Sequence, residues 1–149
     1  MTVISENKKA RFNYLISEKF EAGLSLTGQE VKSLKVRSVN LAGSYVSSKN
    51  NEFYWVEAVI PPYQPANAPA GYDSKRPRKL LLNKEEVRYL IGKANQKSLT
   101  LIPLKIYTKK GKLKLEFGIG KGRKTVNKKE LIKKRETEKS IKRELRMRG

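Results

Sequence analysis

An alternation of apolar and polar residues is the first clear pattern in the chain, and it extends from residue 12 to residue 26. Its even-numbered positions are apolar except for Glu18. Because successive side chains of a strand point to opposite faces, this period of two predicts one long strand, which Gly23 allows to bend.

Two hairpins are predicted further along the chain. The strand-like segments 41–48 and 53–60 are separated by KNNE, whose two asparagines tolerate the positive φ of a tight turn. The second turn lies at Lys110 and Gly111, and the positions after it alternate between apolar and polar residues. The apolar positions of this last strand are Leu113, Leu115, Phe117 and Ile119.

Two short helices are predicted from their capping signals. Thr27 and Glu30 have the T-x-x-E spacing of a capping box, in which each side chain binds the backbone amide of the other residue. The helix that follows would direct Val31 and Leu34 inward. Asn83 begins a second helix with the same spacing, and the apolar residues of this helix repeat as i, i+3, i+4, i+7. These residues are Val87, Leu90, Ile91 and Ala94.

A long segment separates the first hairpin from the second helix. Residues 61–79 hold five of the six prolines of the chain. Loops of this length inside a compact domain are usually functional or disordered. The segment is therefore a candidate for either.

Together these elements predict a mainly β fold of about five antiparallel strands with two or three short inserted helices. The pattern contains no helical crossover of the kind that joins parallel strands. A small, partly closed barrel of the OB type is the most economical arrangement, and a β-sandwich is the alternative. We assign residues 1–120 to this barrel.

The composition changes after Gly120 and predicts a basic tail. Residues 121–149 contain 13 Lys or Arg and 4 Glu, and their few apolar residues do not form a stripe wide enough to pack on a core. We expect this tail to be disordered when free and to fold into a helix on RNA, whose phosphates would offset its charge. The glycines of residues 118–122 do not have the spacing of a phosphate-binding loop, and we interpret them as a flexible hinge.

The charge of the chain indicates a polyanionic partner. Lys and Arg number 34 against 14 acidic residues, which gives a formal net charge of +20. Nucleic acid is the leading candidate, and an anionic membrane surface is second, although the tail lacks an interfacial apolar face. The chain has no apolar run long enough for a membrane-spanning helix and no apolar stretch of a signal peptide at its start. We therefore expect a soluble, cytoplasmic protein without membrane partners.

The residue types that most often carry catalysis are scarce. Histidine and cysteine are absent, and Asp73 is the only aspartate, so the usual general bases and the imidazole and thiolate metal ligands are missing. Glu85 and Glu86 lie in the first turn of a predicted helix, where they compensate the helix dipole. We expect no enzymatic activity, no cofactor and no metal site. The rival is an RNA-processing enzyme that holds Mg²⁺ with a cluster of glutamates.

Three clusters of basic residues are candidates for contact with RNA phosphates. In the long loop, Pro77 spaces two arginines, whose guanidinium groups can bind phosphate bidentately. The clusters are Lys8, Lys9 and Arg11; Lys75, Arg76, Arg78 and Lys79; and Lys121, Arg123 and Lys124. Four aromatic residues are interpreted first as core or loop anchors and second as base-stacking groups. They are Tyr54, Trp55, Tyr63 and Tyr72.

Glu30 stands among lysines and has two interpretations. As the acid of the capping box it would stabilise the helix by about 0.5 to 2 kcal/mol. As a reader of RNA it would accept a hydrogen bond from the amino group of an exposed base. The spacing favours the cap and leaves both interpretations open.

Several sequence blocks carry a further signal. They are GQEVKSLK, VNLAGSYV, PPYQPAN, RPRKLLLNKEEV and LTLIPLKIY, and they occur in order between Lys8 and Arg135. Together they resemble the small protein B family, the SsrA-binding proteins. The resemblance implies an OB-fold barrel that binds the tRNA-like domain of transfer-messenger RNA and delivers this RNA to stalled ribosomes for trans-translation.

The same resemblance implies the partners and the division of labour. The tail would occupy the decoding centre and the empty messenger channel of the ribosome. Alanyl-tRNA synthetase and elongation factor Tu would be indirect partners, since they act on the same RNA. The protein itself would be a monomer that positions RNA.

Site residues also follow from the resemblance. The segment from Gly28 to Ser33 is similar to the part of the family that faces the tRNA-like domain, which supports the reader interpretation of Glu30 beside the cap. The predicted RNA-binding set is Lys8, Arg11, Gly28, Glu30, Lys32, Asn40, Arg76, Arg78, Lys79, Lys121, Arg123 and Lys124. The predicted decoding-centre set is Val126, Asn127, Lys128, Lys129, Lys133, Lys134 and Arg135.

The tail departs from the family pattern at two positions. Family members commonly carry an aromatic residue or a histidine followed by Asp-Lys-Arg, whereas this chain reads Val126-Asn127-Lys128-Lys129. Valine cannot stack on a base as a ring can, and Asn127 lacks the carboxylate, but the two lysines keep the phosphate contacts. The alternative function is a general single-stranded RNA chaperone, which would discriminate little among RNAs.

Overall fold

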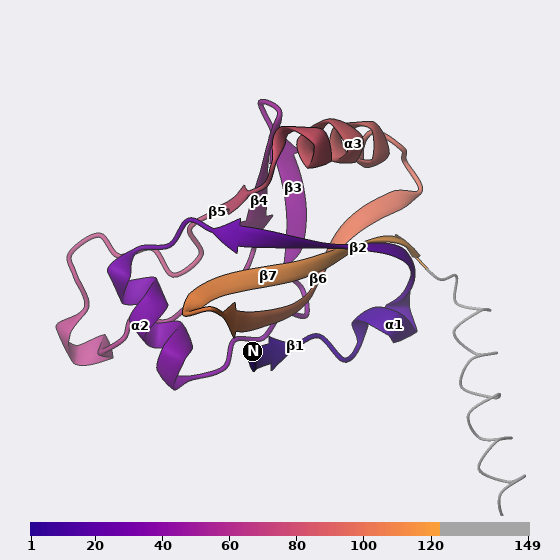
Figure 1. The fold of residues 1–149 in the computed structure, drawn as a ribbon. Coiled ribbons are helices and arrows are strands. Elements are labelled where there is room, and N and C mark those ends of the chain that lie inside the picture. Colours follow the sequence, from indigo (N-terminus) through magenta and orange to yellow (C-terminus); the bar gives the residue numbers. More distant parts are fainter. Residues whose placement is uncertain (123–149) are drawn as a thin grey trace, which may run out of the picture.

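The computed structural model describes residues 1–122 and shows seven strands and three short α-helices within them (Figure 1). The strands are β1 (Thr2–Glu6), β2 (Tyr14–Leu24), β3 (Tyr45–Lys49), β4 (Glu52–Val56), β5 (Arg78–Leu81), β6 (Leu99–Lys109) and β7 (Lys112–Gly122). The helices are α1 (Ala10–Asn13), α2 (Gly28–Val36) and α3 (Lys84–Ala94), with the 3-10 turn η1 at Pro65–Asn67. The predicted tail from residue 123 onward lies outside the described residues.

Six of these strands close into an antiparallel barrel. The order of neighbours is β6-β3-β4-β5-β2-β7, and the long β6–β7 hairpin joins the two ends. Strand β1 pairs with the second half of β6, whereas β3 meets β6 only at Val46 and Leu101. The predicted OB-like barrel with short inserted helices is confirmed, but the count of about five strands is wrong because β1 and β5 were not predicted.

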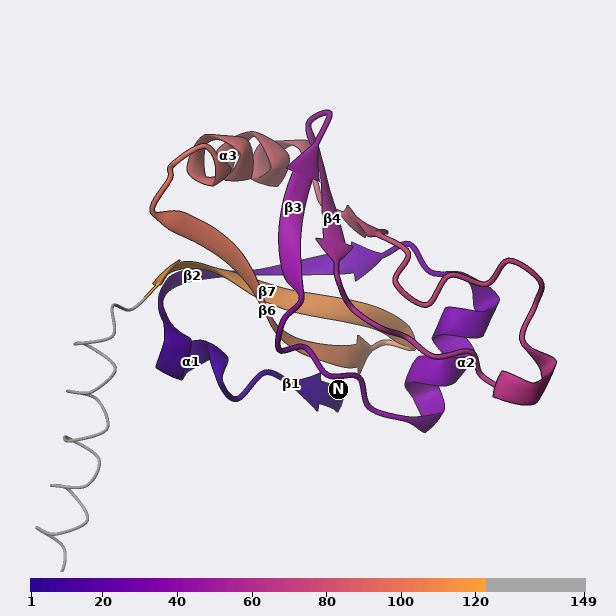
Figure 2. The ribbon, with the colours of Figure 1, turned by 180° about the vertical axis from the view of Figure 1, so that it is seen from behind.

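The two ends of the barrel carry different helices. Helix α2 and the loop between β4 and β5 lie at one end, and α1 lies at the other (Figures 1 and 2). Strands β3 and β4 run across the direction of β2 and β7, as expected for a strongly coiled sheet. The ends therefore offer two separate surfaces.

Strand β2 has the alternation that the sequence predicts. Its even-numbered side chains are the more buried ones, from Tyr14 to Leu24. The pairing with β7 shifts register between Ile16 and Glu18, where the apolar alternation is interrupted. Such a bulge increases the local twist of a strand and helps it to curl around a barrel.

The local signals for caps and turns are confirmed. The Thr27 amide donates to Glu30 Oε1 at 2.9 Å and the Glu30 amide to Thr27 Oγ1 at 3.3 Å, and Asn83 and Glu86 cap α3 reciprocally in the same way. The turn residues of both hairpins have positive φ angles. These angles are 53° and 62° at Asn50 and Asn51, and 51° and 77° at Lys110 and Gly111.

Large apolar side chains from every wall of the barrel form its core. Trp55 is fully buried and its indole donates to Ser44 Oγ at 3.0 Å, so the interpretation of this residue as a core anchor is confirmed. Tyr72 anchors the long loop, because its hydroxyl donates to the Ile60 carbonyl at 2.7 Å. The other fully buried large apolar residues are Phe53, Phe117, Leu34, Leu41, Ile60, Leu90, Ile106, Leu115 and Ile119.

The glycines near the end of β7 serve close packing. A Cβ atom added to Gly120 would lie 2.6 Å from Ile102 Cδ1 and 2.9 Å from Ile16 Cδ1. At Gly118 it would lie 2.8 Å from Ile16 Cγ2. The predicted hinge over residues 118–122 is therefore wrong: β7 continues to Gly122, and two of its glycines let β2 and β6 approach it.

Candidate nucleic-acid interface

Glu30 occupies the centre of a buried ionic cluster at the α2 end of the barrel. Its side chain is 1% exposed. Oε1 accepts hydrogen bonds from the Thr27 amide at 2.9 Å and from Arg76 Nη2 at 2.6 Å. Oε2 accepts from Arg78 Nε at 2.6 Å. One carboxylate thus caps α2 and binds two arginines of the long loop and of β5.

Arg78 is the fully buried partner in this cluster. It begins β5, and its side chain points to the inner face of that strand, where it lies beside the Trp55 ring. Besides Glu30, its guanidinium donates to the Ala58 carbonyl at 2.6 Å and to the Ser74 carbonyl at 3.0 Å. These bonds hold the two ends of the long loop to α2.

The cluster keeps Glu30 ionised. Burial raises the pKa of a carboxyl group because the charged form loses water. Here this effect is outweighed by hydrogen bonds from Arg76, from the Thr27 amide and from Arg78, so the pKa of Glu30 lies below its ordinary value. The negative charge is compensated inside the protein and is not displayed to a partner.

These contacts correct two residue assignments made from the sequence. The cap interpretation of Glu30 is confirmed, and both of its oxygens are occupied in a side chain with almost no exposed surface. Direct phosphate contact by Arg78 is contradicted, because the side chain is 0% exposed and its donors are bound to protein acceptors. The RPR spacing indicated two arginines suited to phosphate, but it did not indicate that Glu30, 48 residues away in the sequence, binds the second one inside the protein.

The long loop is held against α2 by several further hydrogen bonds. Arg76 donates to the Ser25 carbonyl at 3.1 Å, and Arg37 donates to the Tyr63 carbonyl at 3.2 Å. The Tyr63 amide in turn donates to Gln29 Oε1 at 3.2 Å. The sequence left open whether this segment is functional or disordered. In the structure these hydrogen bonds hold it as an ordered loop against α2.

Exposed cations surround this buried cluster. Arg76 keeps 38% of its side chain exposed while bound to Glu30, and Lys32 lies on the α2 surface over the Tyr63 ring. Lys79 points outward from β5 and forms a surface ion pair with Glu52 at 3.2 Å. The α2 end therefore presents Arg76, Lys32 and Lys79 on a framework that the buried charges hold in place.

Gly28 and Asn40 have positions that the sequence did not specify. Gly28 is the exposed first residue of α2, and a Cβ atom there would meet nothing within 4 Å. Asn40 is also exposed, and its side chain accepts from the Ala42 amide at 3.0 Å. Neither residue contacts the Glu30 cluster through a hydrogen bond of the described chain.

A second group of cations lies near α1. Lys8 and Arg11, both predicted from the sequence, line one cavity of about 450 Å³ together with residues of β2, β6 and β7. The additional basic residues are Lys19 and Lys105, which the sequence analysis missed. Lys19 could have been found from its outward position in the β2 alternation, whereas Lys105 joins the group only through the barrel topology. Glu116 forms an ion pair with Lys105 at 3.6 Å.

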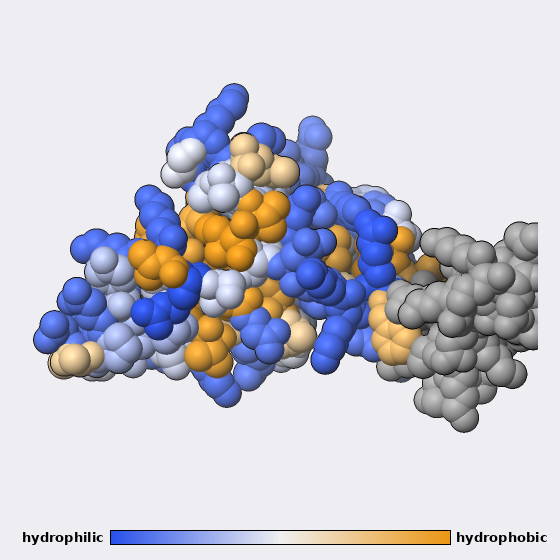
Figure 3. All heavy atoms as spheres, turned by 90° about the horizontal axis from the view of Figure 1, so that it is seen from below, coloured by the Kyte–Doolittle hydropathy of each residue, from blue (hydrophilic) through white to orange (hydrophobic). Residues whose placement is uncertain are grey.

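The face of the molecule below α1 and α2 shows the balance of polar and apolar side chains (Figure 3). Hydrophilic side chains dominate it, and exposed apolar side chains gather between them.

Lys121 is exposed near the end of β7. The remaining predicted site residues lie outside the described residues. These are Arg123, Lys124, Val126, Asn127, Lys128, Lys129, Lys133, Lys134 and Arg135.

Two observations limit the chemistry of the described part of the chain. Residues 1–122 contain no group of three or more metal-ligating side chains close enough to hold an ion. Their helices are too short and too polar for any of them to cross a membrane.

Comparison with known proteins assigns the chain to a family. The family model described as SmpB protein matches residues 4–147. An SsrA-binding protein of Acaryochloris marina is 44% identical over 144 residues, covering 97% of this chain and 94% of the relative. One from Afipia carboxidovorans is 47% identical over 148 residues, covering 99% of this chain and 94% of the relative.

A solved structure agrees with these relatives. It is described as "tmRNA-SmpB: a journey to the center of the bacterial ribosome", and one of its chains superposes on this fold with a TM-score of 0.68. That chain is 44% identical in sequence, and the match covers 84% of this chain and 87% of the other. By sequence and by fold, this chain belongs to the SmpB family of SsrA-binding proteins.

Proposed function

We propose that this protein binds the tRNA-like domain of transfer-messenger RNA and delivers that RNA to stalled ribosomes for trans-translation. The observation that carries the proposal is the match to the SmpB chain of a tmRNA–SmpB ribosome structure, at 44% identity over 84% of this chain. The two relatives named above are both SsrA-binding proteins, and their names support the same RNA.

The exposed cations supply the chemistry for this binding. Lys32, Arg76 and Lys79 at the α2 end, and Lys8 and Arg11 near α1, are placed to neutralise RNA phosphates. The buried pair of Glu30 and Arg78 has a positioning role, because it fixes the loop that carries Arg76. RNA would thus meet a preformed surface.

The tail would perform a second task. We assign residues 1–120 to RNA binding and residues 121–149 to the decoding centre and the empty messenger channel, where the positive charge of the tail would be offset by ribosomal RNA. Such a protein acts in the cytoplasm and catalyses nothing itself. Alanyl-tRNA synthetase and elongation factor Tu act on the bound RNA as indirect partners.

A salt titration of RNA binding tests the first task. Equilibrium binding is measured for transfer-messenger RNA and for an unstructured RNA of equal length. Phosphate contacts alone weaken both complexes alike as salt rises. We expect a preference for transfer-messenger RNA that survives at high salt; parallel curves would instead indicate a general RNA chaperone.

A truncation tests the division between barrel and tail. Removing the residues after Lys124 should leave binding to transfer-messenger RNA intact and abolish rescue of stalled ribosomes in a reconstituted translation assay. An equal loss of binding and rescue would contradict this division.

A further inference from the structure

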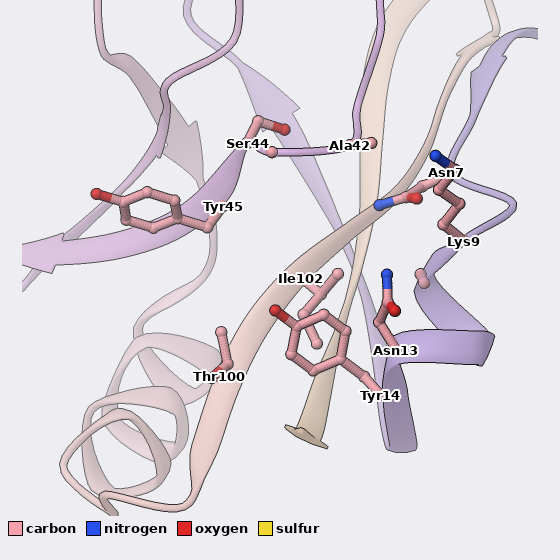
Figure 4. A pocket seen from close by; sticks show the side chains of 11 residues that line it. Asn7, Lys9, Asn13, Tyr14, Ala42, Ser44, Tyr45, Thr100 and Ile102 are labelled. Carbon is pink, nitrogen blue, oxygen red and sulfur yellow. The ribbon is translucent and has the colours of Figure 1, made fainter. Parts of the chain in front are cut away.

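A polar pocket lies between α1, the loop before β3 and the start of β6 (Figure 4). Its volume is about 240 Å³. Residues from three distant parts of the sequence line it, among them Asn13, Tyr14, Tyr45 and Thr100. None of these four residues belongs to the RNA-binding set that was predicted from the sequence.

Several polar groups of this pocket have no partner within the described chain. The side chains of Asn13, Tyr14, Tyr45 and Thr100 form no hydrogen bond with another residue of segment 1–122. By contrast, Asn7 at the pocket wall donates its amide to the Pro103 carbonyl at 2.9 Å, and its oxygen is left as an acceptor. The pocket therefore offers both donors and acceptors that the protein does not use.

The floor of the pocket is apolar and shaped by close packing. Ala10 and Ile102 are buried there, and the Tyr14 ring lies beside Ile102 (Figure 4). Gly120 allows this arrangement, since a Cβ atom at that position would lie 2.6 Å from Ile102 Cδ1 and 3.2 Å from Tyr14 Cβ. The site is thus a slot with a flat, aromatic and aliphatic wall and polar groups at its edge.

This chemistry fits one class of ligand. A planar ring with a polar edge can stack on the Tyr14 side of the slot while the Asn13 amide, a donor and an acceptor, binds its edge. Lys9 at the pocket margin is suited to an attached phosphate. The volume is below the roughly 300 to 1,000 Å³ of typical small-molecule sites, which suits a single ring system better than a whole cofactor.

We infer that this pocket holds one unstacked RNA base, read by Asn13, with Tyr45 at the rim. The inference rests on the proposed function in one respect, that the partner is RNA. The base can come from transfer-messenger RNA or from ribosomal RNA, because both supply the same ring and phosphate. The pocket is separate from the Glu30 cluster, which lies at the other end of the barrel.

A titration with mononucleotides tests the pocket without any assumption about the RNA. The full chain, labelled for NMR, is titrated with each of the four ribonucleoside monophosphates. We expect saturable shifts of the Asn13 side-chain amide and of the Tyr14 and Tyr45 rings, with one base preferred. Ribose 5-phosphate is the control, since it carries the phosphate without a base. Equal shifts with ribose 5-phosphate, or no shifts at these residues, would overturn the inference.

Matched variants then identify the source of the base. Tyr45→Ala removes a tyrosine that is 44% exposed, and Tyr89→Ala removes one on α3 that is 43% exposed and outside the pocket. Asn13→Ala and Asn95→Ala form a second pair, since neither side chain has a hydrogen bond in the described chain. Each variant is assayed for binding to transfer-messenger RNA and to small ribosomal subunits.

The two pocket variants should weaken the same one of these interactions by about fivefold to a hundredfold, the range for the loss of one base contact. The interaction that is weakened, with transfer-messenger RNA or with the small ribosomal subunit, identifies the RNA that supplies the base. One result would overturn the pocket inference and leave the proposed function intact: the wild type prefers transfer-messenger RNA, while the pocket variants bind each partner with the same affinity as the control variants. If the wild type shows no preference, the proposed function falls, and the mononucleotide titration still decides the pocket.

Discussion

The two ends of the barrel treat polar groups in opposite ways. At the α2 end, three charged side chains are directed toward one another, and Glu30 and Arg78 have almost no exposed surface. At the α1 end, the side-chain polar groups of Asn13 and Tyr14 line an open pocket and form no hydrogen bond with another described residue. The polar groups at the α2 end therefore stabilise the fold, whereas those at the α1 end remain available to a ligand.

The comparison shows that charge along a sequence is a poor guide to what a partner touches. The RPR segment is the most basic part of the long loop, yet its second arginine is completely buried. At the α1 end, Asn13 and Thr100 line the pocket although they carry no charge and belong to no sequence motif. Whether a polar group is satisfied inside the protein decides its availability, and that depends on the tertiary structure.

The largest effect is expected from breaking the buried pair. Arg78→Ala leaves the Glu30 carboxylate buried with one donor fewer, and it also removes the bonds to the Ala58 and Ser74 carbonyls. Truncating one partner of a buried ion pair costs about 3 to 5 kcal/mol. We expect the free energy of unfolding in urea to fall by that amount.

Arg76→Ala is the matched control for this prediction. Arg76 binds the same carboxylate, but its side chain is 38% exposed, so its loss exposes Glu30 to water and destabilises less. A loss from Arg76→Ala as large as that from Arg78→Ala would show that burial is not what distinguishes the two arginines.

A somewhat smaller effect is expected at the pocket end from Gly120→Ala. The new methyl group must displace the ends of Ile102 and Ile16, which it would approach to 2.6 and 2.9 Å. Overpacking of this kind costs about 1 to 3 kcal/mol. Thermal or urea unfolding measures the loss, and the shift of Ile102 should also narrow the pocket.

Gly122→Ala provides the comparison within the same strand. Its nearest neighbour would be a Tyr14 ring atom at 4.0 Å, an ordinary contact distance. We expect the stability of this variant to be close to that of the wild type. If both alanines destabilise equally, the strand needs glycine for its backbone and not for the packing of the pocket floor.

The stability of the protein at acid pH should report on the buried Glu30 cluster at the α2 end. The pKa of Glu30 lies below its ordinary value of 4.5, so its ionised form is stabilised by folding. This contribution is complete above pH 4.5 and is lost as the pH falls through the lowered pKa of the folded state. The effect is smaller than that of a truncation because the protonated side chain stays in place.

The Glu30→Gln variant isolates this titration from that of the other carboxyl groups. Urea unfolding of both proteins is measured between about pH 6 and about pH 3. We expect the wild type to lose more stability than the variant over this range. Parallel pH profiles of the two proteins would mean that the charge of Glu30 contributes nothing to the free energy of unfolding.

Local signals in the sequence were enough to predict the caps, the hairpin turns and the alternation of β2. Each of these depends on residues within a few positions of one another, as at Thr27 and Glu30 or at Asn50 and Asn51. Strand β5 escaped prediction because Arg78 occupies an inward position, where a charge hides the alternation. Its burial becomes intelligible only when Glu30, 48 residues away, is known to lie opposite.

Distant contacts also explain why the pocket and the glycine pattern could not be predicted. The groups that require Gly120 to be small belong to β2 and β6, and α1 meets the loop before β3 only in the folded barrel. Family resemblance predicted RNA contacts at α2 and in the basic loop. It gave no indication of which charges were buried, because a motif specifies residue types and not their exposure.

The smallest effect on stability is expected from Lys79→Ala, although Lys79 directly follows Arg78, whose truncation should have the largest effect. Arg78 and Lys79 are neighbours on β5, and they face opposite sides of the strand. The side chains of Lys79 and its partner Glu52 are 46% and 45% exposed, so removing the lysine should leave urea unfolding nearly unchanged. If Lys79 contacts a phosphate, however, the salt dependence of RNA binding should decrease by about one unit of slope. A loss of stability with an unchanged slope would place Lys79 in the framework with Arg78, and the outward face of β5 would no longer belong to the RNA-binding surface.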